Sequence, residues 1–279
     1  MRKVSELYGR HAGVDIYVVG TGTSLRVFPL DVLSDKITIG LNQAWKLLEP
    51  TYGITMMPRL NIPEFVEGEA PRPHITWVTK PSKIKEQCTP EESAHADAHF
   101  FGFENDGRAS ITGLDEPSEA GRMVEWVRNP HPEKLYLWTS ISQSAMNLAA
   151  NMGAKNVVLV GCDNAPLGEN HHAHDQHTMW KGADPQLRYM QYYEGVAEVR
   201  AALRGRGINV VSMTPFAKLD GVEMDFERLC DELDRQRTIR NNDVRRGTTL
   251  RDDNIRYLRL TRYIFNKNLR YLSRRLASR

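Results

Sequence analysis

The sequence predicts a Rossmann-like α/β fold, with a mostly parallel sheet covered by helices on both faces and a basic helical C-terminal extension. Three observations lead to this prediction. Short runs of β-branched residues recur along the chain and end at glycine, asparagine or proline. Helical segments alternate with these runs, as they do around a parallel sheet. The charge of the chain changes sharply near residue 235.

Four strands are predicted in the first half of the chain, at residues 14–19, 36–40, 54–57 and 74–79. A helical turn at 44–48 ends at Pro50. Region 58–132 is interrupted by proline and glycine, so we expect a loop-rich insert there. We place one Rossmann-like domain at 1–234 and a basic amphipathic helical tail at 235–279.

The second half of the chain predicts a βαβ unit. Residues 135–138 and 156–160 have strand composition, and 140–152 predict a helix rich in small residues that ends at Gly153. A long helix at 186–204 and a strand at 208–213 follow.

Composition excludes several classes of protein. The chain is 41% hydrophobic and 26% charged, with no apolar run near the roughly 18 to 20 residues that a membrane-spanning helix needs. The three cysteines, Cys88, Cys162 and Cys230, form no CxxC pair, which disfavours a disulfide framework or a thiolate zinc site. The polar first ten residues show no export signal, so we expect a cytoplasmic protein.

The tail carries most of the positive charge. Residues 235–279 hold fourteen Arg or Lys against three acids, about +11, in a chain of formal net charge +2. Apolar residues recur there at helical spacing, at Ile255, Leu258, Phe265, Leu269, Leu272 and Leu276. Partners that fit are DNA or an anionic membrane, with the enzyme peripheral at the inner membrane surface. The alternatives are a solvated helical face, docking on the domain, or a homo-oligomer contact.

Polar residues follow the predicted strands where ligands bind in open α/β sheets. Gly20, Thr21, Gly22, Thr23 and Ser24 follow the first strand, where glycines would let backbone N–H groups approach a phosphate or ribose. The alternative is a tight turn that uses glycine for steric reasons only. The third glycine of a dinucleotide fingerprint and the GK[ST] of a P-loop are both missing.

Three further strand ends carry polar side chains. Asn42 could read a base or ribose edge, and Thr139 and Ser140 stand at a helix N-terminus suited to phosphate, although either could be a plain N-cap. Asp163 could bind a hydroxyl or a divalent cation, so Mg²⁺ is an optional ligand.

Four of the nine histidines lie within residues 171–177. A neutral imidazole can accept a proton from an attacking hydroxyl, contact a phosphate or bind a metal. The spacing fits neither HExxH nor a zinc-finger pair, so acid/base or phosphate contact is favoured over metal ligation and over a solvated loop.

The motifs IYVVGTGTSL (16–25), IGLN (39–42), TS (139–140) and LVGCD (159–163) resemble the glycosyltransferase group of bacterial lipooligosaccharide sialyltransferases. They are also similar to the related motility-accessory-factor and 6-hydroxymethylpterin diphosphokinase-like proteins. The resemblance covers about half of the chain.

The resemblance implies roles for particular residues. A cytidine nucleotide would be held by the glycine-rich turn, the strand-end Asn and the Thr-Ser pair, which here are Gly20, Gly22, Ser24, Asn42, Thr139 and Ser140. The catalytic base would be His177, with His174 and then His172 as the alternatives.

These observations favour a glycosyltransferase that moves a sugar from a nucleotide-activated donor to a hydroxyl of a polysaccharide, a protein or modified DNA, with no cofactor required. One rival is a pyrophosphokinase that acts on a pterin-like alcohol with ATP, with Mg²⁺ on Asp163. The other is a non-catalytic nucleic-acid- or membrane-binding protein.

Overall fold

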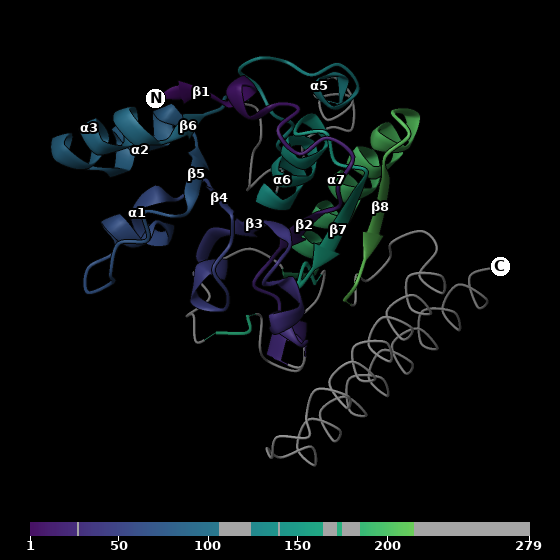
Figure 1. Cartoon of the computed structure of the whole chain (residues 1–279), viewed down its shortest axis with the longest axis horizontal. Coiled ribbons are helices and arrows are strands. Elements are labelled where there is room, and N and C mark those ends of the chain that lie inside the picture. Colours follow the sequence, from purple (N-terminus) through teal and green to yellow (C-terminus); the bar gives the residue numbers. More distant parts are fainter. Residues whose placement is uncertain (27, 106–123, 139, 164–171, 175–184, 215–279) are drawn as a thin grey trace, which may run out of the picture.

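The computed structural model describes residues 1–26, 28–105, 124–138, 140–163, 172–174 and 185–214, with the backbone alone at 185–191. Within these residues, eight strands form one sheet in the order β1-β6-β5-β4-β3-β2-β7-β8, and all neighbouring strands are parallel. The predicted Rossmann-like α/β fold is therefore confirmed (Figure 1). The predicted tail at 235–279 lies outside the described residues.

The strands are, in chain order, β1 (Arg2–Lys3), β2 (Ile16–Val19), β3 (Ile37–Leu41), β4 (Tyr52–Thr55), β5 (Thr76–Thr79), β6 (Phe101–Gly102), β7 (Asn156–Val160) and β8 (Asn209–Ser212). The six predicted strands that became β2, β3, β4, β5, β7 and β8 are confirmed, with ends that differ by at most two residues. The short edge pair β1 and β6 has too few residues to give a periodic signal.

The α-helices are α1 (Pro58–Asn61), α2 (Pro81–Gln87), α3 (Pro90–His99), α5 (Glu125–Arg128), α6 (Ile141–Asn151) and α7 (Pro185–Gly205). Short 3₁₀ turns are η1 (Val4–Leu7), η2 (Thr23–Arg26), η3 (Leu30–Leu33), η4 (Asn42–Lys46) and η5 (Pro63–Phe65). The predicted helices at 140–152 and 186–204 are confirmed as α6 and α7, and Gly153 ends the former with a φ of +94°.

The order of the strands fixes where a ligand could bind. From β2 the chain passes to β3, β4, β5 and β6 on one side, and then returns to β7 on the other side of β2. The direction of winding therefore reverses between β2 and β7. In doubly wound sheets, the crevice beyond the carboxyl ends of the strands at such a switch point is the usual ligand site.

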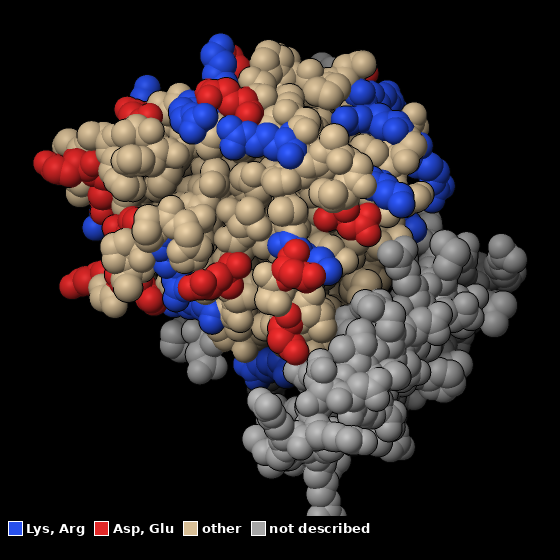
Figure 2. Space-filling model, viewed as in Figure 1, with Lys and Arg blue, Asp and Glu red and all other residues tan. Residues whose placement is uncertain are grey.

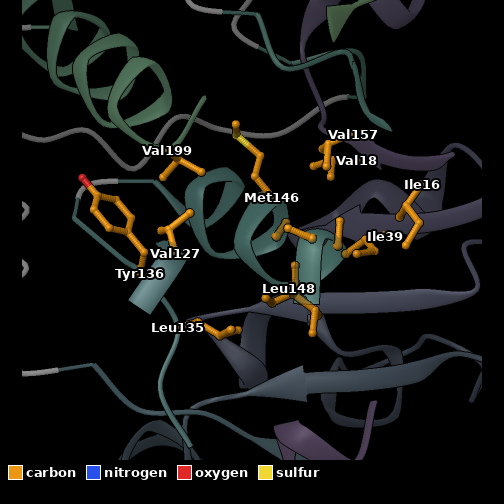
Figure 3. Close-up of a cluster of buried hydrophobic side chains, with 14 of the residues drawn as sticks. Ile16, Val18, Ile39, Val127, Leu135, Tyr136, Met146, Leu148, Val157 and Val199 are labelled. Atoms are coloured by element: carbon orange, nitrogen blue, oxygen red, sulfur yellow. The ribbon is translucent and has the colours of Figure 1, made fainter. Parts of the chain in front are cut away.

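The main core lies between the sheet and the helices α5, α6 and α7. Figure 3 shows α6 between strand side chains, among them Ile16, Ile39 and Val157, and the group formed by Tyr136 and its neighbours. On the opposite face, strand residues such as Val19 and Val160 pack under the 3₁₀ turns η2 and η3. Long helices thus cover one face of the sheet, and short turns cover the other face. The carboxyl ends of β2 and β3 are each followed by one of these short turns.

The predicted strand at 135–138 is wrong. This segment is buried, and its Leu135 N–H donates to Glu104 O at 3.1 Å beside an isolated parallel bridge between Glu104 and Lys134. The next backbone N–H groups bond to side chains of α6 instead of to a strand. The N–H of Tyr136 donates to Asn147 Oδ1 at 2.9 Å, and the N–H of Trp138 donates to Gln143 Oε1 at 3.0 Å. Polar residues on an otherwise apolar helix face satisfy the backbone groups that a strand would have paired.

The described parts of region 58–132, residues 58–105 and 124–132, contain both strands and helices. Among the described residues the region supplies β5 and β6 to the sheet, together with α1, α2, α3 and α5. Four of its prolines, Pro58, Pro63, Pro81 and Pro90, stand at the first position of α1, η5, α2 and α3, where the missing N–H costs nothing. Pro71, Pro73, Pro130 and Pro132 lie outside helices and strands.

Charge is distributed unevenly over the described surface. Figure 2 shows Asp and Glu side chains at the end of the molecule formed by α2 and α3, and Lys and Arg side chains toward the opposite end, near α5 and α7. Within the described part of the chain, no helix combines the length and apolarity needed to cross a bilayer.

A hydrogen-bonded pair, Tyr136 and Glu198 of α7, gives a test of the core. The hydroxyl of Tyr136, which is fully buried, donates to Glu198 Oε2, and burial raises the pKa of the Glu198 carboxyl. A raised folded-state pKa means that the stability from the protonated form is present below the unfolded-state pKa of Glu198. This stability is lost as the pH rises through the folded-state value.

We therefore expect Tyr136→Phe to lower the free energy of unfolding by about 1 kcal/mol, because it removes the donor to a half-buried carboxyl. Glu198→Gln keeps an acceptor for Tyr136 and should flatten the decline in stability above pH 4.5. Urea denaturation between pH 4.5 and pH 7.5 measures both effects. An unchanged pH dependence in Glu198→Gln would contradict the assignment.

Candidate active site

The turn after β2 packs directly on the turn after β7. The N–H of Gly20 donates to Val160 O at 2.8 Å, and the N–H of Gly22 donates to Gly161 O at 2.8 Å. A Cβ on Gly20 would lie 2.3 Å from Gly161 O, and one on Gly22 would lie 2.6 Å from Asp163 Cγ. Both glycines are required because the two turns touch. The close contact of the turns is a steric reason for these glycines, which the sequence analysis gave as the alternative to phosphate or ribose binding.

The turn after β7 is fixed from its other side by β8. Gly161 has a φ of +63°, and its N–H donates to Thr214 Oγ1 at 2.7 Å. A Cβ at Gly161 would lie 2.4 Å from Leu25 Cγ. The strand ends of β2, β7 and β8 therefore form one tightly packed unit.

Asp163 joins this unit through Ser24. Its Oδ2 accepts from the Ser24 N–H at 2.7 Å, and its Oδ1 accepts from the Ser24 hydroxyl at 2.6 Å. Ser24 is only 2% exposed, so both bonds lie where water competes poorly. Asp163 thereby fixes the start of η2, which follows the glycine-rich turn.

These contacts bear on two predictions: that the glycine-rich turn offers N–H groups to a phosphate, and that Asp163 binds a hydroxyl or a cation. The N–H groups of Gly20 and Gly22 donate to carbonyls, so they are not oriented to bind a phosphate. Both carboxylate oxygens of Asp163 bind Ser24, so this residue acts as a link between strand ends. The described residues contain no group of three or more His, Cys, Asp or Glu that could hold a metal ion.

Asn42 stands at the end of β3 in an unusual conformation. Its φ is +51°, the only positive φ at a non-glycine among the described residues, and asparagine tolerates this region best. Its Oδ1 accepts from Thr55 Oγ1 at 3.0 Å and from Asn61 Nδ2 at 3.2 Å. The acceptor of the amide is thus engaged, and the Nδ2 donor is the part of Asn42 that could bind a ligand.

Thr55 and Asn61 hold Asn42 from the end of β4 and from α1. Asn61 also donates to Thr55 Oγ1 at 2.8 Å, and the N–H of Met57 donates to the same oxygen at 3.0 Å. Thr55 is fully buried and Asn61 is 5% exposed. The Asn42 side chain is therefore held in one orientation by buried partners.

The described middle of the histidine cluster, residues 172–174, lies against the glycine-rich turn. The N–H of Ala173 donates to Thr21 O at 2.8 Å, and Arg26 Nε donates to Ala173 O at 3.1 Å. The Ala173 side chain packs on the apolar cluster around η2 and η3. The backbone of the segment is thus anchored to the residues that follow β2.

The two histidines that flank Ala173 contact two different strand ends. His172 Nδ1 lies 2.9 Å from Thr21 Oγ1, after β2, and His174 Nε2 lies 3.0 Å from Gln43 Oε1, after β3. The two imidazole ring centroids are 5.7 Å apart. Thr21, Gln43, His172 and His174 therefore meet at the carboxyl ends of β2 and β3, beside the switch point.

Ser140 is the N-cap of α6. Its hydroxyl accepts from the Ser142 N–H at 3.3 Å, and its own N–H donates to Gln143 Oε1 at 3.3 Å, which makes a capping box. Because α6 leads into the parallel strand β7, its N-terminus lies at the carboxyl edge of the sheet. Thr139 and His177 lie outside the described residues.

The sequence did not predict three of the residues that build this site, Gln43, Thr55 and Asn61. Gln43 follows Asn42 directly, so the strand-end rule that found Asn42 could have found it as well. Thr55 lies inside the predicted strand 54–57 and is the last residue of β4 only in the structure. Asn61 carried no such signal, because its role depends on the path of α1.

The described cysteines are poor nucleophiles. Burial raises the pKa of the Cys162 thiol to about 12, and burial raises that of Cys88 to about 11. A thiol with such a pKa is protonated at neutral pH and inert. Cys162 stands beside Asp163 and is a packing residue of the core.

Three solved structures of a sialyltransferase are similar to the chain. CstII from Campylobacter jejuni with the substrate analogue CMP-3FNeuAc has a TM-score of 0.39 and 10% identity, and covers 71% of this chain and 80% of that one. CstII with cytidine-5'-monophosphate has a TM-score of 0.41 and 11% identity, with coverages of 72% and 80%.

CST-II with a trisaccharide acceptor and CMP has a TM-score of 0.39 and 10% identity, with coverages of 71% and 80%. No family model and no curated protein matches the chain. The function therefore rests on the chemistry of the site.

We expect Asp163→Ala to lower the free energy of unfolding by roughly 2 to 4 kcal/mol, because it removes two charge-assisted bonds and leaves buried donors without an acceptor. Asp35→Ala is the matched control, since Asp35 is exposed and bonds only Lys36 in the described structure. That control should change stability by less than about 0.5 kcal/mol. Equal effects of the two variants in urea denaturation would contradict the linking role of Asp163.

Proposed function

We propose that the chain is a nucleotide-sugar-dependent glycosyltransferase whose site lies at the carboxyl ends of β2, β3 and β7. The observation that carries the proposal is the meeting of imidazoles and strand-end amides. His172 and His174 contact Thr21 and Gln43, next to an Asn42 that is held in one orientation. Transfer of a sugar to a hydroxyl requires a proton acceptor next to groups that can hydrogen-bond a sugar or a nucleoside.

The proposed reaction is a direct displacement. A histidine takes the proton of the acceptor hydroxyl as its oxygen bonds to the anomeric carbon of the donor. The bond from that carbon to the phosphate oxygen breaks, and its electron pair leaves with the nucleotide. The N-terminus of α6 lies at the same edge of the sheet and favours the negative charge of the phosphate.

Asn42 would bind the nucleotide through its Nδ2 donor, since its Oδ1 is occupied by Thr55 and Asn61. The Thr21 hydroxyl, Ser140 and Thr139 would complete the nucleotide site. We propose that no metal is required, because both oxygens of Asp163 bind Ser24. The same contacts give the pyrophosphokinase alternative less support, since it needs Asp163 for Mg²⁺.

The proposal is tested by incubating the full chain with CMP-, UDP- and GDP-activated sugars and a panel of hydroxyl acceptors, with and without EDTA. Release of nucleotide together with a glycosylated acceptor is the expected result. Transfer of pyrophosphate from ATP to a pterin alcohol, or turnover of none of the donors, would contradict the proposal.

We expect His174→Ala to lower turnover by about 10² to 10⁴ while donor affinity stays unchanged, because the base acts on the acceptor. Asn42→Ala should show the opposite behaviour, with donor binding weaker by about 1 to 3 kcal/mol. His99→Ala, on the exposed side of α3, is the control. Full turnover in His174→Ala, measured beside His177→Ala, would assign the base elsewhere.

We further propose that residues 235–279 bring the enzyme to a polyanionic acceptor or surface, on the strength of a charge of about +11. Truncation before Arg235 should leave nucleotide binding intact and weaken binding to DNA or anionic vesicles. A full-length variant with Arg270, Arg274 and Arg275 changed to Gln should lower the salt dependence of that binding. Unchanged binding in both variants would contradict this role.

A further inference from the structure

Gln43 lies between His174 and the backbone of α1, and it contacts both through its side-chain amide. Its Nε2 donates to Leu60 O at 2.8 Å, and its Oε1 lies 3.0 Å from His174 Nε2. The turn that holds it is unusual, since Asn42 has a φ of +51° and Gln43 has φ and ψ of −90° and 20° inside η4. That turn directs two consecutive amide side chains from the end of β3.

The Leu60 carbonyl settles which end of the Gln43 amide faces the histidine. A carbonyl oxygen can only accept, so the amide nitrogen of Gln43 must face Leu60. The amide oxygen therefore faces His174 Nε2. Because that oxygen can only accept as well, His174 Nε2 must carry the hydrogen. In the neutral imidazole, Nδ1 is then the nitrogen that carries the in-plane lone pair.

We propose that Gln43 is a positioning residue that holds His174 in the Nε2–H tautomer and presents Nδ1 as the nitrogen that accepts the proton of the acceptor hydroxyl. The catalytic part of this inference rests on the proposed function, whereas the tautomer does not. When Nδ1 takes the proton, the ring becomes an imidazolium and its Nε2–H bond to Gln43 remains in place.

The surroundings of His174 supply the groups that a test must consider. His172 stands on the same segment with its ring centroid 5.7 Å away, and Arg26 bonds the intervening Ala173 carbonyl. A substitution at Gln43 changes the partner of His174 Nε2 and leaves the His172 and Arg26 side chains unaltered.

The test is nitrogen NMR of the full chain with ¹⁵N-labelled histidine, with the His174 signals assigned from a His174→Gln variant. We expect wild-type His174 to be a single Nε2–H tautomer. Gln43→Leu removes the acceptor and should give a mixture of tautomers and a kcat about 10 to 100 times lower, with an unchanged KM for the donor. Gln87→Leu, on α2 and outside the site, is the matched control and should change neither quantity.

A second variant gives up the bond to Leu60 O but keeps an oxygen acceptor for His174 Nε2 and adds a negative charge. Gln43→Glu should retain the Nε2–H tautomer and move both the titration of His174 and the acidic limb of the pH–rate profile to higher pH, because a carboxylate stabilises the imidazolium. A wild-type His174 protonated at Nδ1, or one with the same tautomer mixture as Gln43→Leu, would overturn the inference. The NMR measurement needs no substrate, so a failure of the tautomer assignment is distinguishable from a failure of the proposed function.

Discussion

Asp163 joins the ends of β2 and β7 by accepting two hydrogen bonds from Ser24, and the geometry of the site depends on this link. The link requires the two turns to touch, and they can touch only because Gly20 and Gly22 lack a Cβ. The direction of winding also reverses at this point. One close contact thereby fixes the edge of the sheet where a ligand crevice is expected.

The functional side chains are attached to this edge by backbone contacts. Thr21 O holds Ala173, and the two flanking histidines are thereby brought to the ends of β2 and β3. On the other side, Thr55 and Asn61 hold Asn42. Groups that are oriented before a ligand arrives lose little freedom when it binds, which is the condition for catalysis by positioning.

The strands that bear the site were predictable because each is a short β-branched run that ends at a turn residue. The segment 135–138 is likewise short and apolar, yet beyond the bond from the Leu135 N–H to Glu104 O its hydrogen bonds go to Asn147, Gln143 and Ser144, and no local pattern encodes that choice. Asn42 and Asp163 were predictable as strand-end polar residues. The use of Asp163 on Ser24 was not, because it depends on how two turns pack across the sheet.

The histidines show the same difference between what a local pattern predicts and what tertiary packing decides. Their clustering indicated chemistry, but their partners Thr21 and Gln43 follow strands that are far away in the sequence. The tautomer of His174 depends on a third element, since the Leu60 carbonyl of α1 orients the Gln43 amide. Local sequence patterns thus predict which residues are candidates for the site, and tertiary packing decides how each of them is oriented.

The central claim is that a nucleotide binds where the β2, β3 and β7 ends meet. Hydrogen exchange followed by mass spectrometry, with and without CMP, UDP and GDP in turn, tests it most directly. We predict that a nucleotide that binds slows exchange in peptides that cover residues 20–26, 41–44 and 172–174. Slower exchange confined to α3 or to residues 235–279, with these three segments unchanged, would contradict the claim.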